Sequence, residues 1–232
     1  MYDDNLNAPP LNPLPWVVVL LSCLVGGVEL MFQAAEAGFI GGPEGIGWRL
    51  WAVQNYAFSD KIFDWMRQTG QYPVPHLVRF VSYIFIHQSM THAIFAVVFI
   101  LALGKFVAEV LHPLAVLLIF FASGAIGAAI YSVILDEQFA LIGAYPAIYG
   151  LIGAFTWLRF TTLQDEGENG LRAFNLIVFF MSIALIYKFL FGGTNDWLAE
   201  LAGFCVGFGL AIILGSDAKL RLKMLLLQFR KR

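Results

Sequence analysis

The residues that could carry chemistry in this chain lie inside strongly apolar stretches. They are two histidines, a tyrosine and a glutamate: His87, His92, Tyr145 and Glu200. Serine-type hydrolysis needs an activated hydroxyl, a base within hydrogen-bond reach and donors for the oxyanion. Residues 140–160 contain no serine. A phenol with a pKa near ~10 is a poor nucleophile, and its bulky ring would fill the slot that a scissile peptide must enter. The sequence therefore predicts no catalytic residue among these four.

The spacing of the polar residues also disfavours a metal site built from His87, His92 and Glu200. On a helix, side chains five residues apart point about 140° away from each other, whereas ligands four residues apart share one face. We therefore expect neither a metal nor another cofactor.

The composition indicates a membrane protein. Of the 232 residues, 59% are hydrophobic and 13% are charged, and the mean hydropathy is +0.75. These values lie outside the range of soluble domains. The net charge of −2 gives no reason to expect nucleic acid as a partner. Several apolar runs approach the ~20 residues that a helix needs to cross a bilayer, so we expect an all-α polytopic membrane protein in contact with lipid.

Six apolar stretches predict six spans within one membrane domain, residues 16–215. Residues 1–15 hold two aspartates and four prolines, which predicts a disordered tail. Residues 216–232 alternate basic and apolar side chains, which predicts an amphipathic tail resting on anionic lipid, with a partner-binding arm as the alternative. The predicted spans are residues 16–33, 77–108, 113–135, 140–160, 171–191 and 197–214.

The segment between the first two spans, residues 34–76, is too polar to cross a membrane. Apolar residues recur at helical spacing from Trp48 to Met66, which predicts a helix in the interface plane with its tryptophans at headgroup depth. Glu29 lies toward one end of the first span, where we expect it to reach the interface in preference to acting as a proton relay. Cys23 and Cys205 are expected to be buried small hydrophobes.

Positive charge predicts the orientation. With both termini cytoplasmic, the inner segments are richer in Lys and Arg than the outer ones, as the positive-inside rule requires. In a bacterium this would be the inner membrane. The inner side would hold Lys105, Arg159, Arg172 and the basic residues of the tail, and the outer side Arg49, Lys61, Arg67, Arg79 and Lys188.

Residues 141–155, LIGAYPAIYGLIGAF, resemble the fourth transmembrane helix of the rhomboid intramembrane serine proteases. In that family a Gly-x-Ser-Gly turn, followed by a Tyr-Gly run, presents the nucleophile. Gly143 and Gly150 match the pattern, but Tyr145 stands at the nucleophile position and Pro146 at the second glycine. Because proline has no backbone N–H, it also removes a donor from the turn.

Two further spans carry the resemblance. His87, His92 and Glu109 match family positions, whereas Ala96 stands where the family has an asparagine of the oxyanion hole. Losing one such donor typically costs ~10²–10³ in rate. In the last span Glu200 replaces the histidine that the family uses as base. The neighbouring glycines and a pair in the first loop agree with the family: Gly203, Gly207, Trp48 and Arg49.

The resemblance implies a six-helix rhomboid-like bundle with an interfacial first loop. It also implies a pseudoprotease, which binds transmembrane segments of other proteins without cutting them, as derlins and inactive rhomboids do. One alternative is a fixed structural or assembly subunit of a larger membrane complex. Another is a protease with unorthodox catalytic residues.

The matched substitutions at Tyr145 and Glu200 suggest a structural bridge. A carboxylate within a span costs roughly 2.5–3.5 kcal/mol on insertion scales, so Glu200 needs a partner. We hypothesise that it hydrogen-bonds Tyr145. The alternatives are a bond to His87 or His92, or a water-filled cavity.

Overall fold

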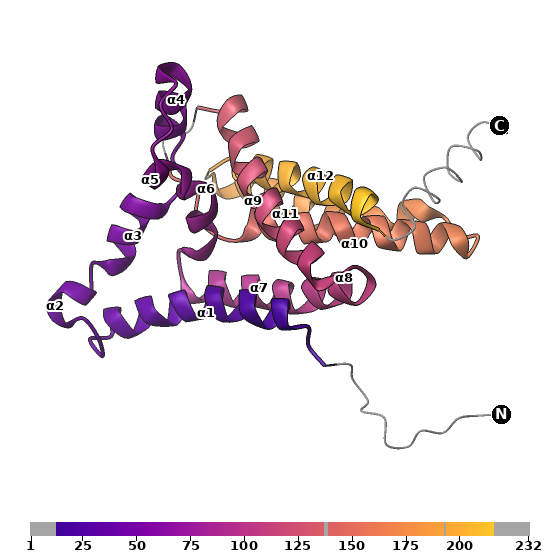
Figure 1. The fold of residues 1–232 in the computed structure, drawn as a ribbon, viewed down its shortest axis with the longest axis horizontal. Helices are drawn as coiled ribbons and strands as arrows, with labels where there is room; N and C mark the ends of the chain where they lie inside the picture. The colour runs from indigo at the N-terminus through magenta and orange to yellow at the C-terminus, as the bar shows by residue number, and fades with distance from the viewer. Residues whose placement is uncertain (1–12, 137–138, 193, 216–232) are drawn as a thin grey trace.

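The computed structural model describes residues 13–136, 139–192 and 194–215, and these are helical without a strand (Figure 1). The tails predicted at residues 1–15 and 216–232 lie outside the described residues, apart from 13–15. Within these described ranges, five helices are long and apolar enough to cross a membrane. They are α1 (Trp16–Glu36), the continuous run Met90–Val110, α9 (Pro113–Ile134), the run Gly170–Phe191 that holds η3 (Gly170–Phe174) and α11 (Asn175–Phe191), and α12 (Trp197–Leu214).

The helix at the predicted fourth span, α10 (Tyr145–Asp165), is as long as the others but less apolar. It is also the most buried helix, since it packs against α9 and α12 (Figure 1). A helix enclosed by other helices meets little lipid, so its sequence tolerates small and polar residues. With α10 in the interior, the described residues form an all-α membrane bundle.

Glycines bring α10 and α12 into backbone contact. A methyl group on Gly207 would overlap the carbonyl oxygen of Gly150, and one on Gly203 would overlap that of Pro146. Small residues at such positions let transmembrane helices approach closely. Three glycines that match family positions, Gly150, Gly203 and Gly207, thus lie at this helix contact.

The first loop differs from the single interfacial helix predicted over 48–66. Residues 42–85 form five short α-helices and a 3₁₀ turn. The predicted helix is interrupted because Phe58 pairs with Leu141, each backbone N–H donating to the other's carbonyl at 3.2 and 2.9 Å. This pair fastens the first loop to the segment that enters α10. The helices are α2 (Gly42–Gly45), α3 (Trp48–Tyr56), α4 (Asp60–Thr69), α5 (Val74–Leu77), α6 (Arg79–Ser82) and η1 (Tyr83–Phe85).

The second span begins thirteen residues later than the predicted residue 77. The chain is not helical from Ile86 to Ser89, and the Ser89 hydroxyl caps the new helix by accepting a hydrogen bond from the His92 N–H at 3.3 Å. The span then runs through α7 (Met90–Phe99), a π-helical segment η2 (Ile100–Gly104) and α8 (Lys105–Val110).

The cysteines contradict their predicted burial. Cys23 and Cys205 are exposed on the outer faces of α1 and α12. A thiol is compatible with lipid, so an outward position costs little.

Candidate functional site

The residues that match the catalytic positions of the resemblance converge at the start of α10. Tyr145 is the first residue of this helix, and its ring stacks on the His92 imidazole with centroids 4.8 Å apart. The His87 ring lies edge-on to His92 at 5.2 Å. The expectation that the histidines point apart is wrong, because His87 belongs to the non-helical segment before α7. Three rings therefore fill the site.

Backbone amides of the turn before α10 are already engaged. Gly143 has φ +101°, which favours glycine, and its N–H donates to the Tyr83 carbonyl at 3.0 Å. The Ala144 N–H donates to His87 Nε2 at 3.3 Å. Pro146 has no N–H. Only the amide of Tyr145 itself is left on this turn to bind an oxyanion.

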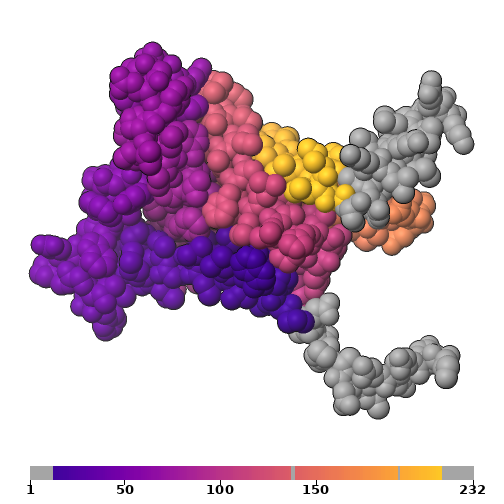
Figure 2. Space-filling model, in the orientation of Figure 1, coloured from indigo at the N-terminus to yellow at the C-terminus, as the bar shows by residue number. Residues whose placement is uncertain are grey.

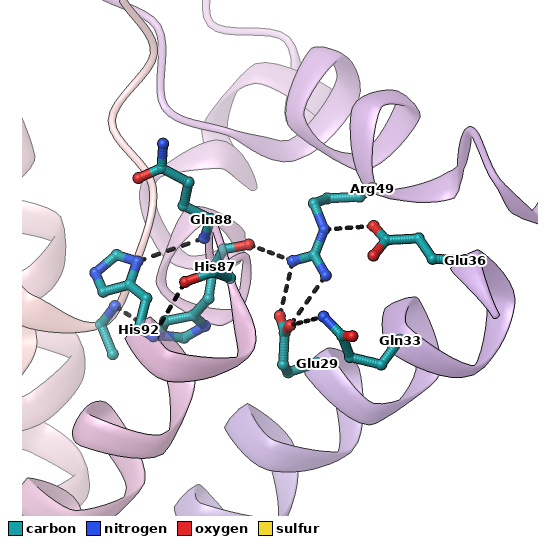
Figure 3. A network of polar contacts seen from close by, with 9 residues as sticks. Glu29, Gln33, Glu36, Arg49, His87, Gln88 and His92 are labelled. Carbon is teal, nitrogen blue, oxygen red and sulfur yellow. Dashed lines mark hydrogen bonds and ion pairs between the residues drawn. The ribbon is translucent and has the colours of Figure 1, made fainter.

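His87 is fully buried and accepts a hydrogen bond at Nε2, so that nitrogen is unprotonated. Burial, and to a smaller extent the neighbouring His92, lowers the pKa of His87 to about 4. The nearby His92 Nδ1 likewise accepts a hydrogen bond, from the Gln88 N–H at 3.4 Å (Figure 3). Both imidazoles thus hold backbone through their acceptor nitrogens, which is a structural use of histidine.

Glu200 does not form the expected bridge to Tyr145. No hydrogen bond joins their side chains, and Glu200 interacts instead with the hydroxyl of Tyr149, one turn further along α10. Its other oxygen, Oε2, is buried without a hydrogen bond. Ala96 is fully buried in α7 and offers no polar atom beyond its backbone. The positions of nucleophile, base and oxyanion donor thus form no hydrogen-bonded chain.

The network around Arg49 is the part of the site region that sequence reasoning missed. Arg49 donates to both oxygens of Glu29 at 2.8 and 2.9 Å and to Glu36 at 2.8 Å (Figure 3). It also donates to the His87 carbonyl at 2.6 Å. The expectation that Glu29 reaches the interface is wrong, since this residue is only 1% exposed. A carboxylate and an arginine 20 residues apart give no periodic signal that would pair them.

This network ties the first loop to α1 and to the histidine segment. The hydrogen bond to Glu29 raises the pKa of Arg49, so the guanidinium stays charged. Gln33 also donates to Glu29 at 2.9 Å, which satisfies the buried carboxylate further. Glu109, the acid that matches a family position, has its Oε1 3.8 Å from Lys105 Nζ at the far end of the second span. Within the described part of the chain, no cluster of three or more His, Cys, Asp or Glu side chains is arranged to hold a metal.

Comparison with known proteins agrees with this arrangement. The family model "Rhomboid domain" matches residues 74–217, which is more than half of the chain. A search of curated proteins with this chain found no match. The matched region contains the ring stack, the glycine-mediated contact between α10 and α12, and Glu200. The chain therefore belongs to the rhomboid family.

Proposed function

We propose that this rhomboid-family membrane protein is a non-catalytic module that binds transmembrane segments of other membrane proteins. The observation that carries the proposal is the stack of Tyr145 on His92 at the position where the family has its nucleophile. A stacked phenol blocks substrate entry, and the two neighbouring imidazoles each use a ring nitrogen to accept a backbone hydrogen bond. Glu200, at the base position, faces Tyr149 instead.

The same geometry argues against hydrolysis by another route. Oxyanion stabilisation needs preorganised donors, and the loss of one costs ~10²–10³ in rate. Here the Gly143 and Ala144 amides are occupied, Pro146 has none, and Ala96 lacks the side-chain donor. A reaction in which the phenol of Tyr145 attacked a peptide would lack both a base and a full set of oxyanion donors.

Binding of a transmembrane segment does not depend on that machinery. α11 buries only one side chain, Ile177, among its 17 residues, so it is the least anchored span. Movement of such a helix would expose the glycine-rich contact and the polar residues of α10 and α12 to a client helix. Small residues and scattered polar groups are what helices recognise in lipid, where apolar surface alone gives no preference.

We also propose that both termini are cytoplasmic, and that the membrane is the inner membrane if the source is bacterial. The excess of Lys and Arg on that side supports this orientation. Labelling of single cysteines placed in the first loop and in residues 216–232, with a membrane-impermeant reagent on intact cells, tests it. Labelling of the tail without labelling of the first loop would show that the orientation is the opposite of the one proposed.

The test of client binding is affinity purification from the native membrane in mild detergent, with partner stoichiometry by mass spectrometry. We expect several substoichiometric proteins that have a transmembrane segment. Ala184→Trp, on the partly buried face of α11, should reduce their recovery, whereas Ile183→Trp, on the exposed face, should not. One partner at fixed stoichiometry, unaffected by Ala184→Trp, would instead identify a structural subunit. Accumulation of cleavage products of the recovered proteins in the presence of the wild type would show that this protein is a protease.

A further inference from the structure

A cavity of about 850 Å³ lies between α1 and the first loop, away from the ring stack. It falls within the roughly 300–1,000 Å³ typical of ligand pockets. Its walls come from three segments: α1, the α2–α3 region, and the end of α6 with η1 and the residue after it. Figure 2 shows this face, where the indigo α1 meets the purple helices of the first loop. The apolar walls include Leu24, Val28, Phe32, Trp48, Trp51 and Phe85.

The position of the cavity determines what can reach it. Its α1 wall belongs to a helix that crosses the membrane, and its opposite wall carries two tryptophans of the first loop. Tryptophan side chains favour the depth of the lipid headgroups. The cavity therefore extends from headgroup depth into the hydrocarbon region, so lipid molecules of the bilayer have direct access to it.

One charged side chain lines the cavity. Glu44 is exposed, and within the described part of the chain it forms no ion pair. The Trp48 ring lies against Gly41, where a methyl group would come within 2.7 Å of ring atom Cζ2. Aromatic faces next to a carboxylate attract a cationic group, and they repel a headgroup of net negative charge.

The cavity is held open by the Arg49 network. The Arg49 guanidinium lies over the Phe32 ring, 5.1 Å from its centroid, and is bonded to Glu29 and Glu36 of α1 (Figure 3). These contacts fix the separation between α1 and α3. An apolar cavity of fixed width beside a carboxylate fits an acyl chain below a headgroup that carries an ammonium group.

We propose that this cavity binds a phospholipid with an amine-bearing headgroup, one acyl chain lying along α1 and the amine lying against Glu44. The proposal does not depend on the client-binding function, because the site lies outside the ring stack and the α10–α12 contact. Its test uses the delipidated full-length protein in detergent, titrated with dioleoyl phosphatidylethanolamine or dioleoyl phosphatidylglycerol and monitored by native mass spectrometry.

The expected result is saturable binding of one phosphatidylethanolamine, about two- to fivefold tighter than phosphatidylglycerol, as an exposed ion pair allows. Glu44→Gln should remove this preference, and Glu166→Gln, which neutralises an exposed acid immediately after the distant α10, should keep it. Equal affinities for the two lipids in the wild type would overturn the assignment of the headgroup.

Filling the cavity tests its location. Ala52 is a buried wall residue, so Ala52→Phe should lower phosphatidylethanolamine binding at least tenfold. Leu50→Phe adds bulk to the exposed face of the same helix and should leave binding unchanged. If Ala52→Phe does not fold, Val28→Phe fills the cavity from α1. Full binding by a folded filled variant would overturn the site, and so would displacement of the lipid by a co-purified transmembrane protein crosslinked at residue 51.

Discussion

The Tyr145 ring lies face to face with the His92 imidazole, with centroids 4.8 Å apart and planes inclined by 20°. The two side chains come from different helices, and the stack closes the gap between the start of α10 and the first turn of α7. The His87 ring packs edge-on against the His92 ring, with centroids 5.2 Å apart. A position that presents a small hydroxyl in proteolytic rhomboids is here occupied by an aromatic contact between helices.

This contact predicts that Tyr145→Ser restores no proteolysis. The substitution supplies a hydroxyl and opens space, but Glu200 still faces Tyr149, and the turn still lacks the amide that Pro146 cannot provide. The measurement is cleavage of a single-span reporter in proteoliposomes, together with labelling by a fluorophosphonate. A thermal unfolding curve close to that of Tyr145→Phe would show that the variant is folded. Turnover by either the wild type or the serine variant would contradict the proposed loss of catalysis.

The sequence was sufficient for the bundle and for most of the helices that form it. Apolar runs of about 20 residues and the glycine-containing motifs depend on local pattern, and they placed α1, α9, α11 and α12 within a few residues. The motif around Gly143 and Gly150 also located α10, which begins five residues after the predicted residue 140. The place of a helix was thus predictable from its motif, whereas the loss of catalysis stays a prediction.

Contacts between distant residues were not predictable from pattern. The spacing of apolar residues predicted one continuous helix from Trp48 to Met66, but the backbone pairing of Phe58 with Leu141 interrupts it. The non-helical segment at His87 turned its ring toward His92, although helical geometry separates them. Glu29 was buried by an arginine twenty residues away. Each outcome depends on which segments meet in three dimensions.

The buried His87 predicts loss of stability in mild acid. Its pKa is about 4 in the folded protein, against about 6.5 in the unfolded chain. Below pH 6.5 the unfolded chain binds a proton that the folded protein does not, so stability falls as the pH decreases from about 6.5 to 4. The loss reaches at most about 3 kcal/mol, because one pKa unit corresponds to about 1.4 kcal/mol.

The measurement is the denaturation midpoint of the detergent-solubilised protein between pH 7.5 and 4.5. His87→Gln should flatten this dependence, since glutamine does not titrate. His112→Asn is the matched control, because His112 is an exposed cap of α9 and asparagine is a good N-cap. A wild-type midpoint that is independent of pH across this range would refute the role of His87.

The Glu29–Arg49 pair predicts a large effect when only one partner is removed. Arg49→Met leaves a carboxylate that is 1% exposed without its cation, which typically costs about 3–5 kcal/mol. The double variant Glu29→Gln/Arg49→Met should recover part of that loss. Arg67→Met removes an exposed pair with Asp64 and should cost less than about 1 kcal/mol. The free energy of unfolding in detergent is measured for all three variants. Equal losses of stability in Arg49→Met and Arg67→Met would show that the buried network adds no more stability than an exposed ion pair.

Two glycines of α12 predict opposite effects of the same substitution. Alanine normally stabilises a helix interior by about 1 kcal/mol relative to glycine. At Gly209 a methyl group meets nothing within 4 Å, so Gly209→Ala should be neutral or mildly stabilising. At Gly207 the methyl group would overlap the Gly150 carbonyl oxygen, which belongs to helix backbone and cannot move without separating α10 from α12. Gly207→Ala should therefore cost about 3 kcal/mol or prevent folding, as severe overpacking does. Thermal unfolding of the two variants in the same detergent compares them directly, and equal midpoints would mean that α10 and α12 are not in backbone contact there.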